Sequence, residues 1–208
     1  MFPISIIIGL LSTPIGAQGF NLDAVISVDV RQGQEFQGIC MALRIPCGIE
    51  IDDDLIQNAG GTFVVRKRKA REALRSALKR YPNHEWTYHD GLLDVHPQRV
   101  LANNPLSASL GKVEFINKDL QALLQLLLDK TKLSTAAEPY PFVENANPRH
   151  FSFVLDKPTA RQVLNTAVVH HAHAAWVTHH TKRSLIGATT RLVFFDYELE
   201  SRSGDATK

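Results

Sequence analysis

The fold is decided by the stretch KAREALRSALKRYPNHEWTYHDGLLDVHP, residues 69–97. Its first part carries an apolar stripe with the i, i+3, i+4 spacing of a helix that lies on a core. The stripe consists of Ala70, Ala73, Leu74, Ala77 and Leu78. The second part alternates polar and apolar residues on either side of Asp90-Gly91, a strong two-residue turn signal. The stretch therefore predicts a helix followed by a β-hairpin.

The helix and the Trp that follows it return 90 residues later, without gaps. The aligned pairs include Ala70 with Ala160, Leu74 with Leu164, Ala77 with Ala167 and Trp86 with Trp176. A shared apolar stripe aligns any two amphipathic helices, but a coincident Trp after loops of equal length is harder to reach by chance. The sequence thus predicts a tandem duplication. The equivalent positions of the two Trp residues favour a packing role for both.

Each predicted unit begins with a further helix and contains several short strands. The additional apolar stripes are Phe36, Ile39, Cys40 and Leu43, then Leu120, Leu123, Leu124, Leu127 and Leu128. Strand-like alternation occurs around residues 26–30, 49–51, 63–65, 113–115 and 151–155. We expect an α+β fold of two tandem two-layer βαββαββ-like domains, each with two helices packed on a small mixed sheet. The predicted domains are 20–98 and 111–198, with a linker at 99–110 and a disordered tail at 199–208.

Composition excludes several classes of protein but names no partner. The 208 residues are 44% hydrophobic and 21% charged, with a formal net charge of +2. These values exclude a fully disordered chain, a collagen-like repeat and a dense disulfide scaffold. A charge so close to zero gives no general attraction for nucleic acid, which we do not expect as a partner.

The first 17 residues, MFPISIIIGLLSTPIGA, contain no charged side chain. An apolar run followed by a small residue, here Ala17, is typical of a secretory signal peptide, although basic residues are missing from its start. An N-terminal anchor and a buried first strand are the alternatives. Thr13 and Pro14 interrupt the run before the roughly 18 residues that a membrane span needs. We expect a signal peptide over 1–17 and a periplasmic or secreted protein with no transmembrane segment after cleavage.

The chain has two cysteines, Cys40 and Cys47. Cys40 lies on the apolar stripe of a predicted helix and Cys47 begins the next strand, so the pair could come within bonding distance. A disulfide between them would persist in an oxidising compartment. The alternative is a pair of small buried hydrophobic side chains, and the sequence leaves both open.

The first unit resembles the short N-terminal domain of secretins and TonB-dependent receptors (the STN domain). The resemblance rests on ALRIPCGIEID (42–52), on the strand GTFVV (61–65) and on the closing segment 69–97. The second unit is similar through VEFINKDLQALLQLLLDKTKL (113–133) and FSFVLDKPTARQVL (151–164). Its ending departs from the pattern, because TKRSLIGATT (181–190) replaces the tight turn.

The resemblance implies a periplasmic protein–protein interaction module and supplies no catalytic residue or cofactor. We therefore expect a non-enzymatic exported protein that binds an envelope protein through an exposed sheet edge or the 181–190 loop. An accessory subunit of a secretion or pilus assembly is an alternative. The sequence gives neither the partner's identity nor the oligomeric state.

Five of the nine histidines lie between His170 and His180. Neutral imidazoles that converge on one point are common metal ligands. A helix end facing a strand end would bring together His170, His173 and His179, and a metal-binding envelope protein is therefore the rival hypothesis. The competing interpretation is a set of solvated or partly packed side chains, because a strand of about five residues keeps its ends roughly 15 Å apart.

The segment 66–80 carries eight cations against one acid, Glu72. Its leading part is a candidate patch for an anionic partner, such as a lipid surface, a glycan or an acidic protein face. The patch consists of Arg66, Lys67, Arg68, Lys69 and Arg71. Aromatic residues are not interleaved as stacking on nucleic acid would need. The alternative is a solvated outer helix face.

The acidic run Glu50, Asp52, Asp53 and Asp54 has a spacing that supports no particular chemistry. It lacks the spacing and the glycine of a calcium-binding loop. Consecutive acids in one turn cannot all converge on a single reacting atom. A turn or a helix start explains Asp52–Asp54.

Overall fold

The computed structural model describes residues 21–52, 61–99, 104–131, 133–135, 150–171, 174–181 and 189–196. The predicted signal peptide, the predicted C-terminal tail and most of the 181–190 loop lie outside these residues. The fold is mixed α+β, as the sequence predicts, and its helices and strands follow the same order in the two halves of the chain.

The elements of the first half are β1 (Val25–Arg31), α1 (Glu35–Leu43), β2 (Cys47–Asp52), β3 (Thr62–Lys69), α2 (Ala70–Leu78), β4 (His84–His89) and β5 (Leu92–Pro97). A short 3₁₀ helix, η2 (Pro105–Ser107), follows. The elements of the second half are β6 (Val113–Lys118), α3 (Leu120–Lys130), β7 (Leu133–Thr135), β8 (Phe151–Leu155), α4 (Ala160–His171), β9 (Ala174–Thr181) and β10 (Thr189–Asp196).

Residues 69–97 form the predicted helix and hairpin. The apolar stripe of α2 is buried at Ala70, Ala73, Leu74 and Ala77. Asp90 and Gly91 have φ angles of 51° and 80°. Two successive positive φ angles characterise the turn that joins right-twisted strands through two residues. β4 and β5 therefore form the predicted hairpin.

Six strands form one central sheet in the order β4-β5-β2-β9-β10-β7. Each half contributes three of them with the same pairings: β5 is parallel to β2 as β10 is to β7, and β4–β5 and β9–β10 are antiparallel. β2 and β9 pair in parallel and join the two halves. The sequence predicts a separate small sheet for each unit, and the structure instead shares one sheet between them.

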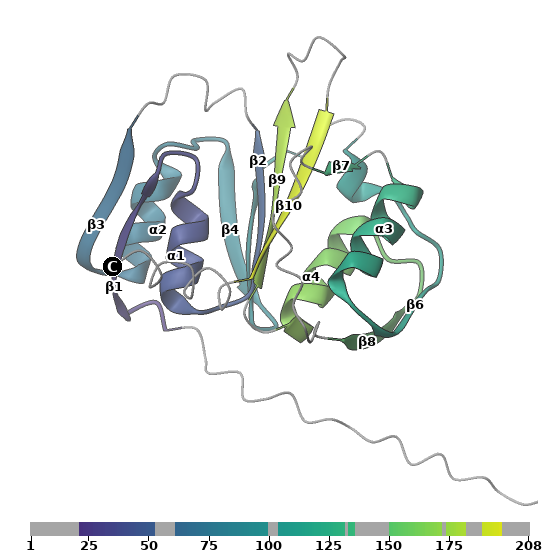
Figure 1. The fold of residues 1–208 in the computed structure, drawn as a ribbon. Coiled ribbons are helices and arrows are strands. Elements are labelled where there is room, and N and C mark those ends of the chain that lie inside the picture. The colour runs from purple at the N-terminus through teal and green to yellow at the C-terminus, as the bar shows by residue number, and fades with distance from the viewer. Residues whose placement is uncertain are drawn as a thin grey trace, which may run out of the picture.

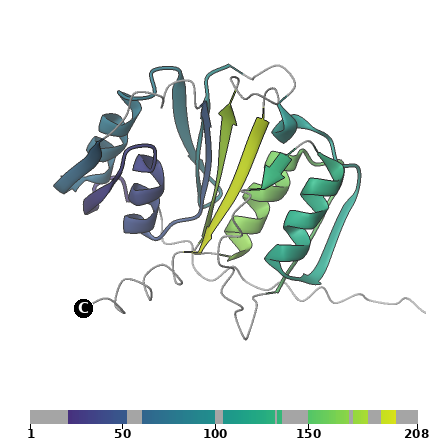
Figure 2. The same cartoon turned by 45° about the horizontal axis from the view of Figure 1, so that its top comes forward.

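The second half is turned over relative to the first. Because β9 is parallel to β2, whereas β4 is antiparallel to it through β5, the strands of the second half run opposite to their counterparts. Reversed strands in an unchanged order place the second pair of helices on the other face of the sheet. Figures 1 and 2 show α1 and α2 on one side of the sheet and α3 and α4 on the other.

The remaining strands form two antiparallel two-stranded ribbons. The first ribbon is β1–β3 and the second ribbon is β6–β8. They cover the outer sides of the helices and lie at opposite ends of the molecule (Figure 1). Each has a register shift, where Lys67 and Asn117 take positive φ angles of 47° and 50°. The helices thus lie between a ribbon and the central sheet, not on one sheet alone.

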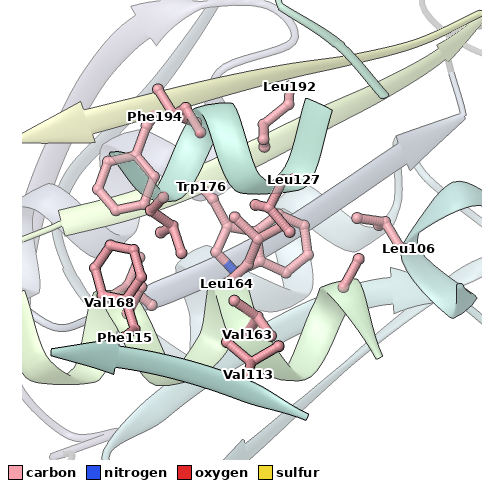
Figure 3. Close-up of a cluster of buried hydrophobic side chains, with 14 of the residues drawn as sticks. Leu106, Val113, Phe115, Leu127, Val163, Leu164, Val168, Trp176, Leu192 and Phe194 are labelled. Atoms are coloured by element: carbon pink, nitrogen blue, oxygen red, sulfur yellow. The ribbon is translucent and has the colours of Figure 1, made fainter. Parts of the chain in front are cut away.

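Two hydrophobic cores occupy the two faces of the central sheet. Successive residues of a strand point to opposite faces, so Ala175 and Val177 of β9 join the first core while Ala174 and Trp176 join the second. Figure 3 shows Trp176 among side chains from α3, α4, β6 and β10. Trp176 is fully buried, and Trp86 packs against the first core at the edge of the sheet. Both indoles therefore have the predicted packing role.

A disulfide and the packing of the predicted linker further stabilise the fold. Cys40 and Cys47 form a disulfide, one of the two states that the sequence leaves open, and it ties the end of α1 to the start of β2. The described part of the predicted linker 99–110 is packed into the second core through Leu106 and Leu110. Among the described residues, no helix is long and apolar enough to cross a membrane.

Candidate functional site

Two acidic side chains of the first half lie on the face of the central sheet that α4 covers. Glu50 in β2 is 2% exposed and Asp94 in β5 is 6% exposed. The helices of the first half lie on the other face, so in an isolated first half these carboxylates would meet water. Their burial therefore comes from the second half. The contact between the halves is therefore the candidate site.

Gly48 allows the second half to approach β2 closely. A Cβ atom at this position would lie 2.6 Å from Cζ2 of Trp176 and 2.7 Å from Oδ1 of Asn165. Separations this short do not occur at real Cβ atoms. The bare backbone of Gly48 is therefore what lets the indole ring lie against the strand.

The first turn of α4 supplies the cation that pairs with both acids. The N–H of Gln162 donates to Oγ1 of Thr159 (3.3 Å), and the N–H of Thr159 donates to Oε1 of Gln162 (2.8 Å). This reciprocal cap fixes the start of the helix and with it Arg161. Arg161 forms ion pairs with Oε2 of Glu50 and with Oδ1 of Asp94, the latter at 3.0 Å.

Glu50 has two further partners through its other oxygen. Nδ2 of Asn104 donates to Oε1 of Glu50 (2.6 Å), and Nε2 of His180 lies 2.7 Å from the same oxygen. Nδ1 of His180 lies 2.8 Å from Oγ1 of Thr190. A chain of polar contacts thus runs from β2 through β9 to β10.

Asp94 is held in a similar way from α4. Nδ2 of Asn165 lies 3.4 Å from Oδ2 of Asp94, and Oδ1 of Asn165 accepts a hydrogen bond from Nε1 of Trp176 (2.8 Å). The guanidinium of Arg161 lies 5.5 Å from the centre of the Trp176 ring, within the range of a cation–π contact. The junction cluster consists of Glu50, Asp94, Asn104, Arg161, Asn165, Trp176, His180 and Thr190.

Burial shapes the electrostatics of the junction cluster. It lowers the pKa of Arg161 to about 10, so the guanidinium remains charged at neutral pH. Burial raises the pKa of Asp94 above its usual value, while His96 and the hydrogen bond from Asn165 act in the opposite direction. A charged Arg161 between two buried carboxylates compensates charges that would be costly to bury alone.

Part of the cluster has the order of groups that activates a nucleophile. Hydroxyl, imidazole and carboxylate follow one another at Thr190, His180 and Glu50, as in hydrolases. All three residues are buried, and Arg161 neutralises the carboxylate. A cavity of about 220 Å³ adjoins the cluster, and its lining includes Glu50, Asp94, Asn104 and Arg161 but neither His180 nor Thr190. The arrangement suits a clamp between the halves better than attack on a substrate.

The predicted metal ligands are not brought together in the part of the structure that is described. His170 is exposed at the end of α4, where its ring lies 6.0 Å from that of Phe153. His179 is half-buried near the far end of β9, and His173 lies outside the described residues. Within the described ranges, no group of three or more His, Cys, Asp or Glu side chains could hold a metal ion.

The predicted anionic-partner patch lies on the end of β3 and the first turn of α2. Arg66, Lys67, Arg68 and Lys69 are exposed. Asp23 pairs with Lys69 (3.1 Å) and with Arg71 (2.8 Å), and the hydrogen bond from Lys69 lowers the pKa of Asp23. Arg68 lies 3.9 Å from Glu72. The patch is therefore a real surface feature, partly neutralised by acids.

The sequence does not single out the junction cluster, although it contains one usable signal. Glu50 stands between Ile49 and Ile51 in a strand that is otherwise apolar up to its last residue, Asp52. A charged residue on one face of such a strand indicates either water or a partner on that face. Grouping Glu50 with Asp52–Asp54 as one acidic turn conceals this alternation.

No family model, curated protein or solved structure matches the chain.

Proposed function

We propose that the protein is an exported, non-enzymatic protein–protein interaction module of the cell envelope, made of two tandem STN-like units at residues 20–98 and 111–198. The observation that carries this proposal is the repeated order β-α-β-β-α-β-β, in which the equivalent strands pair alike in both halves. A repeated order with repeated pairings is the expected product of duplication. The family that the units resemble binds other proteins through such domains.

The disulfide supports the assignment to an exported protein. Cys40 and Cys47 are both fully buried and bonded to each other. Structural disulfides persist in the periplasm and outside the cell and are rare in a reducing cytosol. The apolar N-terminal run supplies an independent indication of export.

The junction cluster supports a binding role over a catalytic one. Its carboxylates, guanidinium, amides and imidazole take one another as partners across β2, β5, α4 and β9. The imidazole of His180 and the hydroxyl of Thr190 do not line the adjoining cavity, where a substrate would have to reach them. Here the charged groups are used to join the two halves.

The second ribbon is the surface that we assign to the protein partner. Ile116 and Val154 are each 56% exposed on its outer side. Among the described strands β6 and β8 pair only with each other, so a partner's extended segment can add to this ribbon as a further strand. The two exposed side chains would then pack against apolar residues of that segment.

Site-specific photo-crosslinking tests this assignment. A photoreactive amino acid replaces Val154 in the full chain, which is produced in its own host and irradiated in intact cells. We expect covalent capture of one envelope protein, and a secretin or inner-membrane protein would also identify the chain as an accessory subunit. The matched control carries the same group at Gln121, an exposed position of α3. Equal capture from both positions, or none from Val154, would contradict the proposal.

A further inference from the structure

The outer side of the first ribbon combines exposed apolar and basic side chains. Val25 is 65% exposed and Val64 is 46% exposed. Arg66 follows Val64 by two residues, the spacing at which strand residues share a face. Asp29 stands opposite Val64 in the register and is the acid on this side. The surface is therefore amphipathic, with a basic excess toward the end of β3.

The local backbone exposes two successive cations. A register shift in the ribbon leaves Arg66 and Lys67 together opposite Ser27, and the N–H of Lys67 donates to Oγ of Ser27 (3.1 Å). In a regular strand two neighbouring side chains point to opposite faces, but a bulge redirects one of them. Both Arg66 and Lys67 are exposed as a result.

The fold itself does not require Arg66, Arg68 or Lys69, as the second half demonstrates. The same strand-to-helix passage occurs there between β8 and α4. At an offset of 90 residues, Val64 corresponds to Val154, whereas Arg66, Arg68 and Lys69 correspond to Asp156, Pro158 and Thr159. In the helices, Arg75 and Lys79 correspond to Asn165 and Val169. The apolar pattern is kept, whereas of the cations only Lys67 and Arg71 have basic counterparts, Lys157 and Arg161.

Ion pairs within the molecule involve only some of the eight cations of residues 66–80. Lys69 and Arg71 share Asp23, Arg68 pairs with Glu72, and Arg80 pairs with Glu35. Four exposed cations have no ion pair within the described ranges: Arg66, Lys67, Arg75 and Lys79. They remain available to an external anion.

We propose that the first ribbon and the start of α2 form a docking surface for an anionic phospholipid bilayer. Val25 and Val64 would enter the boundary between headgroups and acyl chains, and the cations would contact the headgroup phosphates, as in other interfacial segments. The exposed valines favour a bilayer over an acidic protein or a glycan, because a polyanion alone offers them no apolar partner. The surface lies at the opposite end of the molecule from the second ribbon (Figure 1).

Vesicle co-sedimentation of the purified chain tests the proposal. The probes are vesicles of phosphatidylcholine alone and vesicles in which about a third of the lipid is phosphatidylglycerol. We expect binding to the anionic vesicles that weakens with added salt. Because each basic residue near such a surface is worth about a factor of five in binding, Arg66→Glu/Lys67→Glu should bind at least tenfold more weakly. If the chain binds neither kind of vesicle, the proposal is wrong.

A second pair of variants distinguishes a bilayer from a soluble polyanion. Val25→Ser/Val64→Ser keeps every charge and should weaken binding to anionic vesicles, while binding to polyglutamate stays unchanged. The matched control is Val154→Ser/Lys157→Glu, at the corresponding passage of the second half, and it should bind vesicles as the unaltered chain does. If the valine variant binds vesicles normally, the surface recognises charge alone and the proposal is wrong. The melting temperature of each variant confirms that it is folded.

The test is independent of the proposed protein–protein function. It uses purified chain and defined lipids, so a failure to capture an envelope partner through Val154 would leave its outcome unaffected.

Discussion

At the scale of the residue, two buried positions, Gly48 and His84, make the stability of the protein sensitive to substitution and to pH. Gly48 sets how closely the indole of Trp176 approaches β2. His84 at the start of β4 is 4% exposed, and its Nε2 lies 3.4 Å from the backbone N–H of Asp52. Gly48 has no room for a side chain, and burial disfavours a charge on His84. We therefore expect stability to depend on side-chain size at the first position and on pH at the second.

Replacing Gly48 by Ala should destabilise the protein by about 1–3 kcal/mol, the usual cost of adding a methyl group to a well-packed core. The new Cβ would meet the ring of Trp176 and the amide of Asn165, which themselves share a hydrogen bond. Urea denaturation measures the change. Gly61→Ala is the control, because its Cβ would meet only the end of the Gln32 side chain, at 3.3 Å. Equal effects at both positions would refute the steric explanation.

The stability of the protein should fall as the pH decreases below 6.5, in part because of His84. Burial lowers the pKa of His84 from its usual value of 6.5. The unfolded chain therefore takes up this proton first, and the free energy of unfolding decreases from pH 6.5 down to the lower pKa of the folded state. His84→Gln should show a shallower decrease over this interval. An unchanged or steeper profile for His84→Gln would contradict the assignment.

At the scale of the element, α4 is fixed to two strands by ion pairs and α1 is fixed to one strand by a covalent bond. The first turn of α4 is held to β2 and β5 by the two ion pairs of Arg161. The last turn of α1 is tied to β2 by the disulfide. Both devices act on β2, the strand through which the first half meets the second.

Arg161→Met should cost about 3–5 kcal/mol, because it leaves two buried carboxylates without their cation. Arg71 occupies the equivalent position in the first half, where its partner Asp23 is about half exposed, so Arg71→Met should have little effect. Denaturant unfolding of both variants makes the comparison. Adding Glu50→Gln to Arg161→Met should recover part of the loss, and strict additivity of the two changes would show that the pair is not coupled.

Removing the disulfide with Cys40→Ala/Cys47→Ala should lower the free energy of unfolding by roughly 2–3 kcal/mol, the chain-entropy value for a loop of this size. The bond closes a loop with a sequence separation of 7 residues. The measurement is urea denaturation with and without reductant. The unaltered chain should become equivalent to the variant once its disulfide is reduced, and insensitivity to reductant would contradict a structural role.

Sequence periodicity predicts the elements but not the contact between the halves. The stripe of α2 and the Asp90-Gly91 turn are encoded within a few residues, so they can be recognised locally. The pairing of β2 with β9 joins Glu50 to His180 across a separation of 130 residues, and no local pattern encodes it. Gly48 and Glu50 would be exposed in a separate first domain. Their interpretation therefore changes once α4 is seen to cover them.

At the scale of the whole molecule, the shared sheet makes the two repeated halves depend on each other. β9 is buried on both faces, with side chains in both cores. α4 of the second half covers acids of the first. Neither half carries all of its own packing, which predicts a single cooperative unit.

The chain should unfold in one transition when each half is observed separately. Trp86 reports on the first half and Trp176 on the second, so Trp176→Phe and Trp86→Phe leave one fluorescent probe in each case. The fraction unfolded is measured against urea concentration by fluorescence and by circular dichroism. For each variant, the two curves should coincide. A fluorescence transition that separates from the dichroism of the same variant would reveal two independent domains.

The parallel pairing of β2 with β9 also determines when the nascent chain can complete its central sheet. Synthesis completes β2 long before β9 exists, since the paired residues Glu50 and Thr178 lie far apart in the sequence. Until then one side of β2 and the carboxylates of Glu50 and Asp94 lack their cover. Long-range pairings of this kind slow folding and leave strand edges open to misassembly. The protein should therefore depend on a holding chaperone until β9 emerges, a need that a pair of self-sufficient domains would not have.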